Sequence, residues 1–116
     1  MSQPIILKQL LNIHEIADQF NWQPFREGVD IHRLYGDSQS GAAAALLRYQ
    51  PGASVPGHNH EGFEHILVLS GSQTDTNGEH VAGTLVINPP GTGHSVVSEG
   101  GCIVLAIWEK PISLWS

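Results

Sequence analysis

The sequence has little of several features that mark common classes of protein. It contains a single cysteine, Cys102, which excludes an internal disulfide and a thiolate zinc cluster within one chain. It has only five basic residues against 11 acidic ones, and the basic residues are scattered rather than gathered into a stripe. Nucleic acid is therefore not expected as a partner, because binding to phosphates depends on clustered Lys and Arg.

Long apolar runs and targeting signals are also missing from the sequence. No run approaches the roughly 20 apolar residues that a membrane-spanning helix needs. The first residues, MSQPIILKQLL, lack the basic head and the small-residue cleavage site of a secretory signal. We therefore expect a cytoplasmic protein with no membrane partner. A chain of 116 residues that is 41% hydrophobic and 14% charged fits one globular domain rather than a disordered chain.

Turn-forming residues, in contrast, are abundant and evenly spread. The 13 glycines and seven prolines separate short apolar runs, a pattern that is typical of the strands of a sandwich or small barrel. The expected strands are Val29–Tyr35, Ala42–Tyr49, Glu64–Ser70, Gln73–Thr76, Thr84–Ile87, His94–Val97 and Cys102–Trp108. The pair Asn77-Gly78 predicts a hairpin turn after the fourth of these strands.

Two segments in the first half of the chain have helix-favouring features. The four alanines Ala42–Ala45 favour a helix intrinsically, but the run that holds them is too short for a helix and is assigned as strand. Leu7–Phe20 has the only helix-like spacing of apolar residues, so a short helix is expected there. The predicted organisation is an N-terminal extension, residues 1–28, with room for a helix and a strand, followed by a β-barrel domain, residues 29–116.

The stretch PGHNHEGFEHILVLSG joins three potential metal ligands to an apolar run. His58 and His60 are two residues apart and project to the same side if the chain is extended, and Glu64 follows at another even step. Ile66 and Val68 continue the face of Glu64, so its carboxylate is expected to point into a core. A buried carboxylate needs compensation, which a divalent cation bound with the imidazoles would supply.

A second stretch, GTLVINPPGTGH, ends in His94. The stiff turn Asn88-Pro89-Pro90-Gly91 ends one strand and leads to another that begins at His94. If this strand neighbours the first stretch, His94 lies beside the other three candidates. Considered alone, His94 is better explained as a turn residue whose ring hydrogen-bonds to the backbone.

Together the two stretches resemble both motifs of the cupin superfamily. The matching positions are Gly52, His58, His60, Glu64 and Gly71 in the first motif, and Gly83, Pro89, Gly91 and His94 in the second. Ser98 departs from the family pattern, which usually has Asn there. More narrowly, LLRYQPGASVPGHNHEGFEHILVLSG, NPPGTGH and SEGGCIVLAIWE resemble the ChrR-type cupin domain, here as a stand-alone single-domain protein.

The resemblance implies an all-β fold, a small antiparallel β-barrel or jelly roll of the RmlC-like type. It implies one divalent transition metal near the barrel mouth, held by His58, His60, Glu64 and His94. It also implies a small-molecule ligand in the barrel and a homodimer. Three imidazoles and one carboxylate suit zinc, iron, manganese, nickel or copper, so the ligand types do not choose among these metals.

Three functions are compatible with such a domain. The first is a metal-dependent enzyme that acts on a small molecule, such as a dioxygenase-like oxidoreductase or an isomerase. The second is a non-catalytic metal-binding sensor or regulatory module, related to the cupin domain of ChrR-type anti-sigma factors. The third is a cupin that keeps its metal only as a structural staple. No cysteine–histidine zinc pattern precedes Val29, which disfavours a stand-alone anti-sigma factor.

Four further residues carry secondary predictions. Arg48, just before the first motif, is a candidate for gripping a carboxylate substrate in the cavity, and an ion pair with an acidic residue on the rim is the alternative. His65 follows Glu64 directly and is expected to face outward, and His80 is expected to be exposed after the hairpin turn. Cys102 lies in an apolar strand and is expected to be a small buried hydrophobe and a poor nucleophile.

Overall fold

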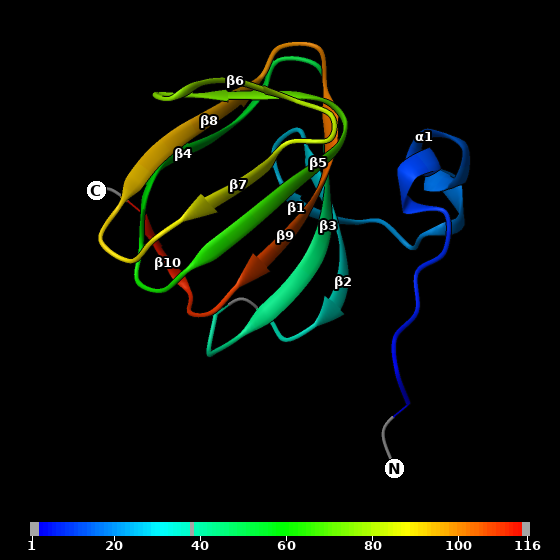
Figure 1. Ribbon diagram of the computed structural model, residues 1–116, viewed down its shortest axis with the longest axis horizontal. Helices are drawn as coiled ribbons and strands as arrows, with labels where there is room; N and C mark the ends of the chain where they lie inside the picture. The colour runs from blue at the N-terminus through cyan, green and yellow to red at the C-terminus, as the bar shows by residue number, and fades with distance from the viewer. Residues whose placement is uncertain (1–2, 38, 115–116) are drawn as a thin grey trace.

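The computed structural model describes residues 3–37 and 39–114, which form ten strands and a short helical segment. Every strand pairing among these residues is antiparallel. The strands curl around one interior, and the helical segment lies beside them on the outside (Figure 1). The expected all-β barrel with a short N-terminal helix is therefore confirmed. Ser38, Trp115 and Ser116 of the predicted barrel domain lie outside the described residues.

The elements follow the turn signals of the sequence with a few additions. The strands are β1 Gln23–Arg26, β2 Val29–Tyr35, β3 Ala43–Tyr49, β4 Ala53–His60, β5 Glu64–Asp75, β6 Gly78–Val81, β7 Leu85–Asn88, β8 Gly93–Ser98, β9 Cys102–Trp108 and β10 Ile112–Leu114. The helical segment consists of α1, Ile13–Ile16, between the single 3₁₀ turns Leu10–Asn12 and Ala17–Gln19. The helix is thus shorter than the predicted Leu7–Phe20. None of the helices in the described part of the chain is long and apolar enough to cross a membrane.

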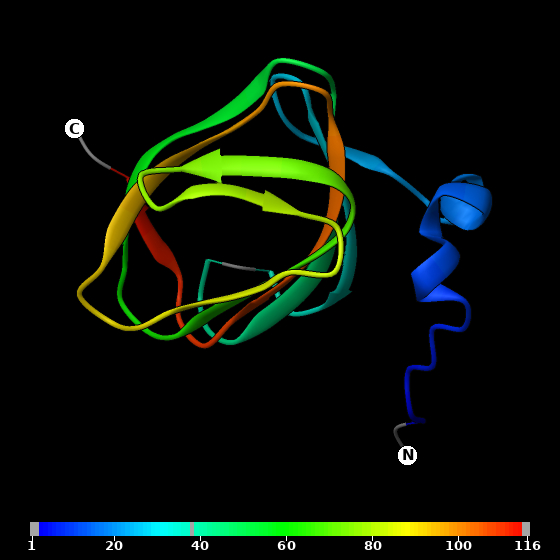
Figure 2. The same cartoon turned by 45° about the horizontal axis from the view of Figure 1, so that its top comes forward.

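The long strand β5 belongs to both curved sheets of the barrel. Its first half pairs with β7 and β9, and the order continues through β3 and β2 to β1. Its second half pairs with β6 and β8, and that sheet continues through β4 to β10. Figure 2, in which the top of the molecule is tilted toward the viewer, shows the strands curling around the interior with the β5–β6 hairpin across it. The sequence predicted two strands here, but Gly71, with a φ of 73°, bends one continuous strand instead.

The alanine-rich segment forms β3 because pairing on both sides outweighs its helical preference. It pairs with β2 on one side and with β9 on the other. Ala43, Ala45 and Leu47 face the main core inside the barrel. Leu46 faces outward and joins a second cluster around Ile13 of α1. The strand is therefore covered on both faces, by the barrel interior and by the helical segment.

The predicted division at residue 29 falls between two paired strands. Strand β1 lies in the segment predicted as an N-terminal extension, and it pairs with β2 through a tight hairpin in which Arg26 is opposite Val29. Phe25, also on β1, packs against the main core. The segment before residue 29 therefore contributes side chains to the barrel interior.

Cys102 has the environment that the sequence predicted. It is 4% exposed and belongs to the main core, and burial raises the pKa of its thiol to about 11. We expect iodoacetamide at pH 8 to modify the folded protein at least about 100-fold more slowly than the urea-unfolded protein, because the thiolate is the reactive form. The single cysteine makes the mass shift unambiguous, and equal rates in the two states would show that this burial is wrong.

Candidate metal centre

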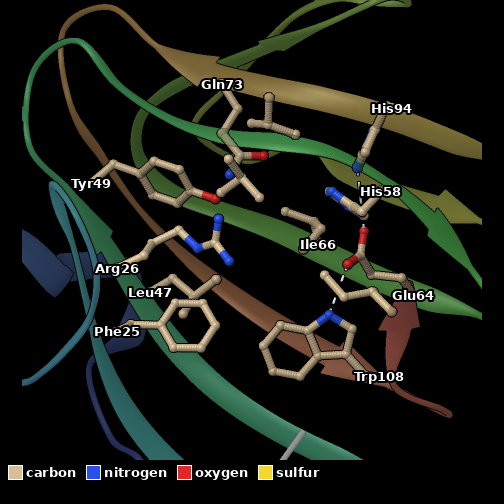
Figure 3. A pocket seen from close by; sticks show the side chains of 13 residues that line it. Phe25, Arg26, Leu47, Tyr49, His58, Glu64, Ile66, Gln73, His94 and Trp108 are labelled. Atoms are coloured by element: carbon tan, nitrogen blue, oxygen red, sulfur yellow. Dashed lines mark hydrogen bonds and ion pairs between the residues drawn. The ribbon is translucent and has the colours of Figure 1, made fainter. Parts of the chain in front are cut away.

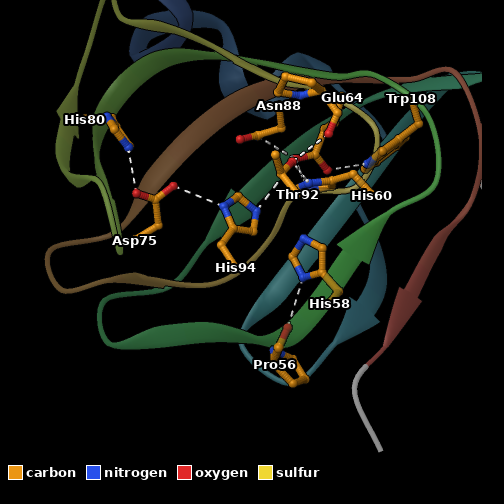
Figure 4. A network of polar contacts seen from close by, with 11 residues as sticks. Pro56, His58, His60, Glu64, Asp75, His80, Asn88, Thr92, His94 and Trp108 are labelled. Atoms are coloured by element: carbon orange, nitrogen blue, oxygen red, sulfur yellow. Dashed lines mark hydrogen bonds and ion pairs between the residues drawn. The ribbon is translucent and has the colours of Figure 1, made fainter.

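Strand register brings together the four residues that the sequence predicted as metal ligands. His58 on β4 lies directly opposite His94 on β8, and His60 lies two residues further along β4. Glu64 begins β5. All four side chains are buried, and one potential ligand atom from each lies within 4.8 Å of the others (Figure 4). Within the described residues, these four form a group that could hold a metal ion.

The three imidazole rings converge on a common point. Their ring centroids are 4.7 to 5.1 Å apart, and each pair of ring planes crosses at 79° to 81°. Two ligand atoms on opposite sides of an ion, with bonds of about 2.1 Å, lie about 4.2 Å apart. The observed spread is therefore close to that of a ligand set, and small side-chain movements would close it.

Hydrogen bonds at Nδ1 fix the orientation of two of the rings. His58 Nδ1 lies 3.0 Å from the carbonyl oxygen of Pro56, and His94 Nδ1 lies 3.0 Å from Asp75 Oδ2. A carbonyl and a carboxylate can only accept, so we assign the ring proton to Nδ1 in both residues. Each Nε2 then carries a lone pair toward the centre of the group, as in the histidine ligands of metalloproteins.

A threonine holds His60 in the same tautomer, with the ring proton on Nδ1. Its Nδ1 lies 3.0 Å from Thr92 Oγ1, and that hydroxyl donates to the carbonyl oxygen of Pro89 at 2.6 Å. Because the hydroxyl proton is already used, Thr92 accepts from His60 Nδ1–H. His60 Nε2 is consequently the third lone pair that points into the group.

The carboxylate of Glu64 is held by its two cross-strand neighbours. Register places Glu64 opposite Asn88 on β7 and opposite Trp108 on β9. Asn88 Nδ2 donates to Oε1 at 3.1 Å, and Trp108 Nε1 donates to Oε2 at 2.8 Å. Two donors from opposite sides fix an ionised carboxylate, which has only acceptor capacity.

A cation between these groups would resolve an unfavourable contact. His60 Nε2 is buried and has no hydrogen-bond partner in the described part of the chain, although Glu64 Oε1 lies 3.0 Å away. With the proton on Nδ1, two acceptors face each other at this distance, which is costly in a buried site. The residues therefore fit a bound metal, whose positive charge would satisfy both atoms.

The pKa shifts of His58 and Glu64 agree with a neutral imidazole beside an ionised carboxylate. Burial lowers the pKa of His58, which favours the neutral ring that a metal requires. Burial alone would raise the pKa of Glu64, but its polar neighbours, including the donating Trp108 N–H, outweigh burial and hold this pKa below its usual value. Glu64 is therefore ionised at neutral pH.

The four candidate ligands, His58, His60, Glu64 and His94, are called the metal-ligand group, and this group opens onto a cavity inside the barrel (Figure 3). The cavity has a volume of about 50 Å³. Three of the four candidate ligands, His58, Glu64 and His94, belong to its lining. Its other lining residues are Phe25, Arg26, Leu47, Tyr49, Val55, Ile66, Gln73, Val96, Trp108 and Ile112. A metal held by the group would therefore face a partly open and largely apolar space.

The structure places Arg48 away from this cavity. Residues of β3 alternate between the two faces, and it is Leu47 and Tyr49 that line the cavity. Arg48 points to the outer face, where its guanidinium lies 4.5 Å from the Trp22 ring centroid and 3.3 Å from Asp30 Oδ2. The ion pair with an acidic residue is thus the observed arrangement, and the arginine of the cavity is Arg26, which sequence reasoning did not single out.

Two further histidines lie outside the group of four. His65 is half-buried on the opposite face of β5 from Glu64, with its ring 6.4 Å from that of Phe63. His80 is less exposed than predicted, with 16% of its side chain accessible, because its Nε2 lies 3.0 Å from Asp75 Oδ1. Asp75 therefore links His80 to the candidate ligand His94.

Asp75 is the supporting residue whose removal is expected to weaken metal binding most clearly. It accepts from His94 Nδ1–H, and such outer carboxylates typically contribute 10- to 100-fold to metal affinity. We expect Asp75→Asn to lower zinc affinity by about tenfold in competition with a chromophoric chelator. His80→Gln, which alters the other oxygen of the same carboxylate, is the matched control and should change affinity by less than about threefold. Equal effects of the two variants would contradict this role.

The comparison with protein families now decides the identity of the domain. Residues 12–110 match the model of the ChrR cupin-like domain. The chain belongs to the ChrR cupin-like family. The resemblance inferred from the two motifs is therefore confirmed, and the match begins well before the predicted boundary at residue 29.

The relatives of this ChrR cupin-like domain differ in size and description. Anti-sigma-E factor ChrR of Cereibacter sphaeroides is 39% identical over 73 residues, which are 61% of this chain and 34% of that protein. The structure of Rhodobacter sphaeroides SigE in complex with the anti-sigma ChrR matches with a TM-score of 0.70 and 29% identity, over 84% of this chain and 54% of the other. The chain thus spans about a third to a half of these relatives.

A third relative shows the fold alone. An acetylacetone dioxygenase from Acinetobacter johnsonii matches all of this chain and 79% of its own, with a TM-score of 0.78 but only 15% identity.

Within the ChrR cupin-like domain itself, the departure at Ser98 has a structural explanation. The buried hydroxyl of Ser98 donates to the carbonyl oxygen of Ser72 at 2.6 Å, which ties β8 to β5.

Proposed function

We propose that this protein is a metal-dependent cupin enzyme that acts on a small molecule, as a dioxygenase-like oxidoreductase. The observation that carries this proposal is the joint placement of His58, Glu64 and His94 in the ligand group and in the cavity lining. A purely structural metal would need no space beside it, whereas a small molecule in this cavity would meet the metal directly.

The metal would be held by His58, His60, Glu64 and His94, and when bound it would supply a Lewis acid and, if redox-active, a partner for dioxygen. The protein itself would orient the metal ligands and limit the access of water. Asn88 and Trp108 hold the Glu64 carboxylate in place, while the largely apolar lining offers water few hydrogen-bond partners. The ligand types do not select one metal, because zinc, iron, manganese, nickel and copper all suit three imidazoles and a carboxylate.

Oxygen consumption by the iron-loaded protein tests the proposal. We expect uptake with at least one member of a panel of β-diketones and β-keto acids, and no uptake after replacement of His58 with alanine. The zinc-loaded protein is the matched control, because zinc binds the same ligands without redox chemistry. If the protein binds one equivalent of iron but consumes no oxygen with any of these substrates, the proposed dioxygenase function is rejected.

A non-catalytic metal-binding sensor or regulatory module is the second candidate. The 39% identity with an anti-sigma factor favours it, although this chain spans only 34% of that protein. Under this alternative, metal or ligand binding would change the affinity for a partner protein and no substrate would be turned over. The cytoplasmic location predicted from the sequence stays a prediction under both functions.

We also propose that two copies of the chain pair through the outer face of β7. Leu85 and Ile87 are 55% and 52% exposed, and register places them beside Leu67 and His65 of β5. A hydrophobic strip of this kind on a sheet face is a typical homodimer contact. Light scattering should give the mass of a dimer for the wild type and of a monomer for the double variant Leu85→Lys, Ile87→Lys. A monomeric wild type would reject the pairing.

A further inference from the structure

Arg26 presents a guanidinium to the cavity without an acidic partner. It is the last residue of β1, and its side chain points into the cavity beside Tyr49 and Gln73 (Figure 3). Its Nε is buried and has no hydrogen-bond partner within residues 3–37 and 39–114. No carboxylate of those residues lies within ion-pair distance of it. Arg48 Nε is likewise buried and without a partner among those residues, but Asp30 Oδ2 lies 3.3 Å from Arg48 Nη2 and balances its charge.

The cavity has two polar ends separated by apolar walls. Figure 3 shows His58, Glu64 and His94 at one side and Arg26, Tyr49 and Gln73 at the other. The lining between and around them is apolar and comprises Phe25, Leu47, Val55, Ile66, Val96 and Ile112, with the indole of Trp108. Arg26 is half-buried, and its guanidinium carbon lies 5.6 Å from the Phe25 ring centroid. An anion would stabilise it further, because the apolar walls limit its solvation. The described chain supplies none at the Arg26 end.

The neighbours of Arg26 are suited to the same anion. Burial raises the pKa of Tyr49 well above its usual value, so its hydroxyl remains a donor at neutral pH. Gln73 is buried and offers two amide protons. The planar guanidinium donates in a fork whose spacing matches the two oxygens of a carboxylate.

We infer that the cavity binds a small carboxylate, with its charged group on Arg26, Tyr49 and Gln73 and its remainder directed toward the metal-ligand group. This inference rests on the proposed function, since it names the substrate class of the same site. The cavity volume of about 50 Å³ limits the ligand to a small molecule. The metal's charge exceeds that of Glu64, so both ends of the cavity favour an anion.

Calorimetric titration with two probes of equal size tests the inference. Malonate and acetylacetone have the same number of non-hydrogen atoms, but malonate is an anion at pH 7 and acetylacetone is largely neutral. We expect malonate to bind zinc-loaded wild type, and Arg26→Gln to weaken this binding at least tenfold. The same variant should change acetylacetone binding by less than about twofold. Arg26→Lys should retain part of the malonate affinity, because it keeps the charge but loses the fork.

Arg48→Gln is the matched control, because it removes a guanidinium that stands outside the cavity. It should leave malonate binding unchanged. Thermal unfolding of each variant confirms that the fold is intact. The inference is overturned if wild type does not bind malonate, or if Arg26→Gln and Arg48→Gln bind it as the wild type does, since the metal alone would then account for binding.

A nuclear magnetic resonance titration separates failure of this inference from failure of the proposed function. In the metal-free protein, malonate should shift the Arg26 Nε–H resonance, which is identified by its absence in Arg26→Lys. Sodium chloride at equal ionic strength should not shift it. If zinc does not bind but this resonance responds to malonate, the metal assignment fails and the carboxylate site stands. If zinc binds and the resonance does not respond, the carboxylate site fails alone.

Discussion

Replacing His60 with alanine is expected to abolish stoichiometric binding of a divalent transition metal to the protein. His60 Nε2 is buried and unpartnered beside the Glu64 carboxylate, so it gains most from a bound cation. We expect the wild type to retain about one zinc per chain after dialysis, and the variant to bind it at least about 100-fold more weakly. Elemental analysis and chelator competition measure the two quantities.

A histidine outside the group provides the control for this variant. His65 is on the opposite face of β5 from Glu64, so His65→Ala should retain one zinc per chain. Thermal unfolding supplies a second reading, because zinc at 100 times its dissociation constant stabilises a folded protein by about 2.7 kcal/mol. Zinc should raise the melting temperature of wild type and of His65→Ala, but not that of His60→Ala. A full zinc response of His60→Ala would remove His60 from the ligand set.

Replacing Gly71 with alanine is expected to lower the free energy of unfolding by about 3 kcal/mol or more. Gly71 has a φ of 73° at the bend where β5 passes from one sheet to the other. A Cβ there would overlap the carbonyl oxygen of Gly101 and would lie 2.9 Å from Cys102 Cα. Both neighbours are backbone atoms of a paired segment, so relief requires the two strands to move apart. Urea unfolding followed by circular dichroism measures the loss.

Gly52 separates the steric effect from the effect of backbone conformation. Its φ is 83°, close to that of Gly71, but a Cβ built on it meets no atom of the described residues within 4 Å. Gly52→Ala should therefore cost only the left-handed conformation, about 1 to 2 kcal/mol. If Gly71→Ala and Gly52→Ala lower the free energy of unfolding by similar amounts, close packing at the β5 bend is not the reason that glycine is required there.

The convergence of the four candidate ligands could be predicted from sequence because even spacing on strands keeps side chains on one face. His58 and His60 lie on one face of β4, and Glu64 shares the inward face of β5 with Ile66 and Val68. The partners of Glu64 could not be predicted, because they depend on strand register. Register places Asn88 and Trp108 on either side of Glu64, and neither residue is near it in sequence. The role of Asp75 could not be predicted for the same reason, although the hairpin turn at Asn77-Gly78 was predicted.

The placement of Arg48 shows where alternation in a sequence stops being informative. Its strand, β3, is buried on both faces from Ala43 to Leu47, so the pattern of side chains does not reveal which face lines the barrel. The inward face belongs to Leu47 and Tyr49, and the outer face is covered by the N-terminal helical segment.

Strand β4 was not predicted for a different reason, because Pro56 interrupts it at a register shift between Val55 and His58.

X-ray absorption at the metal edge of the protein loaded with one equivalent of zinc tests the central claim most directly. The account predicts a first shell of nitrogen and oxygen atoms alone, with the multiple scattering of three imidazoles, from His58, His60 and His94, and one carboxylate from Glu64. The imidazole signal should fall by one ring in His94→Ala. A shell without imidazole scattering, or one that contains the sulfur of Cys102, would contradict the account.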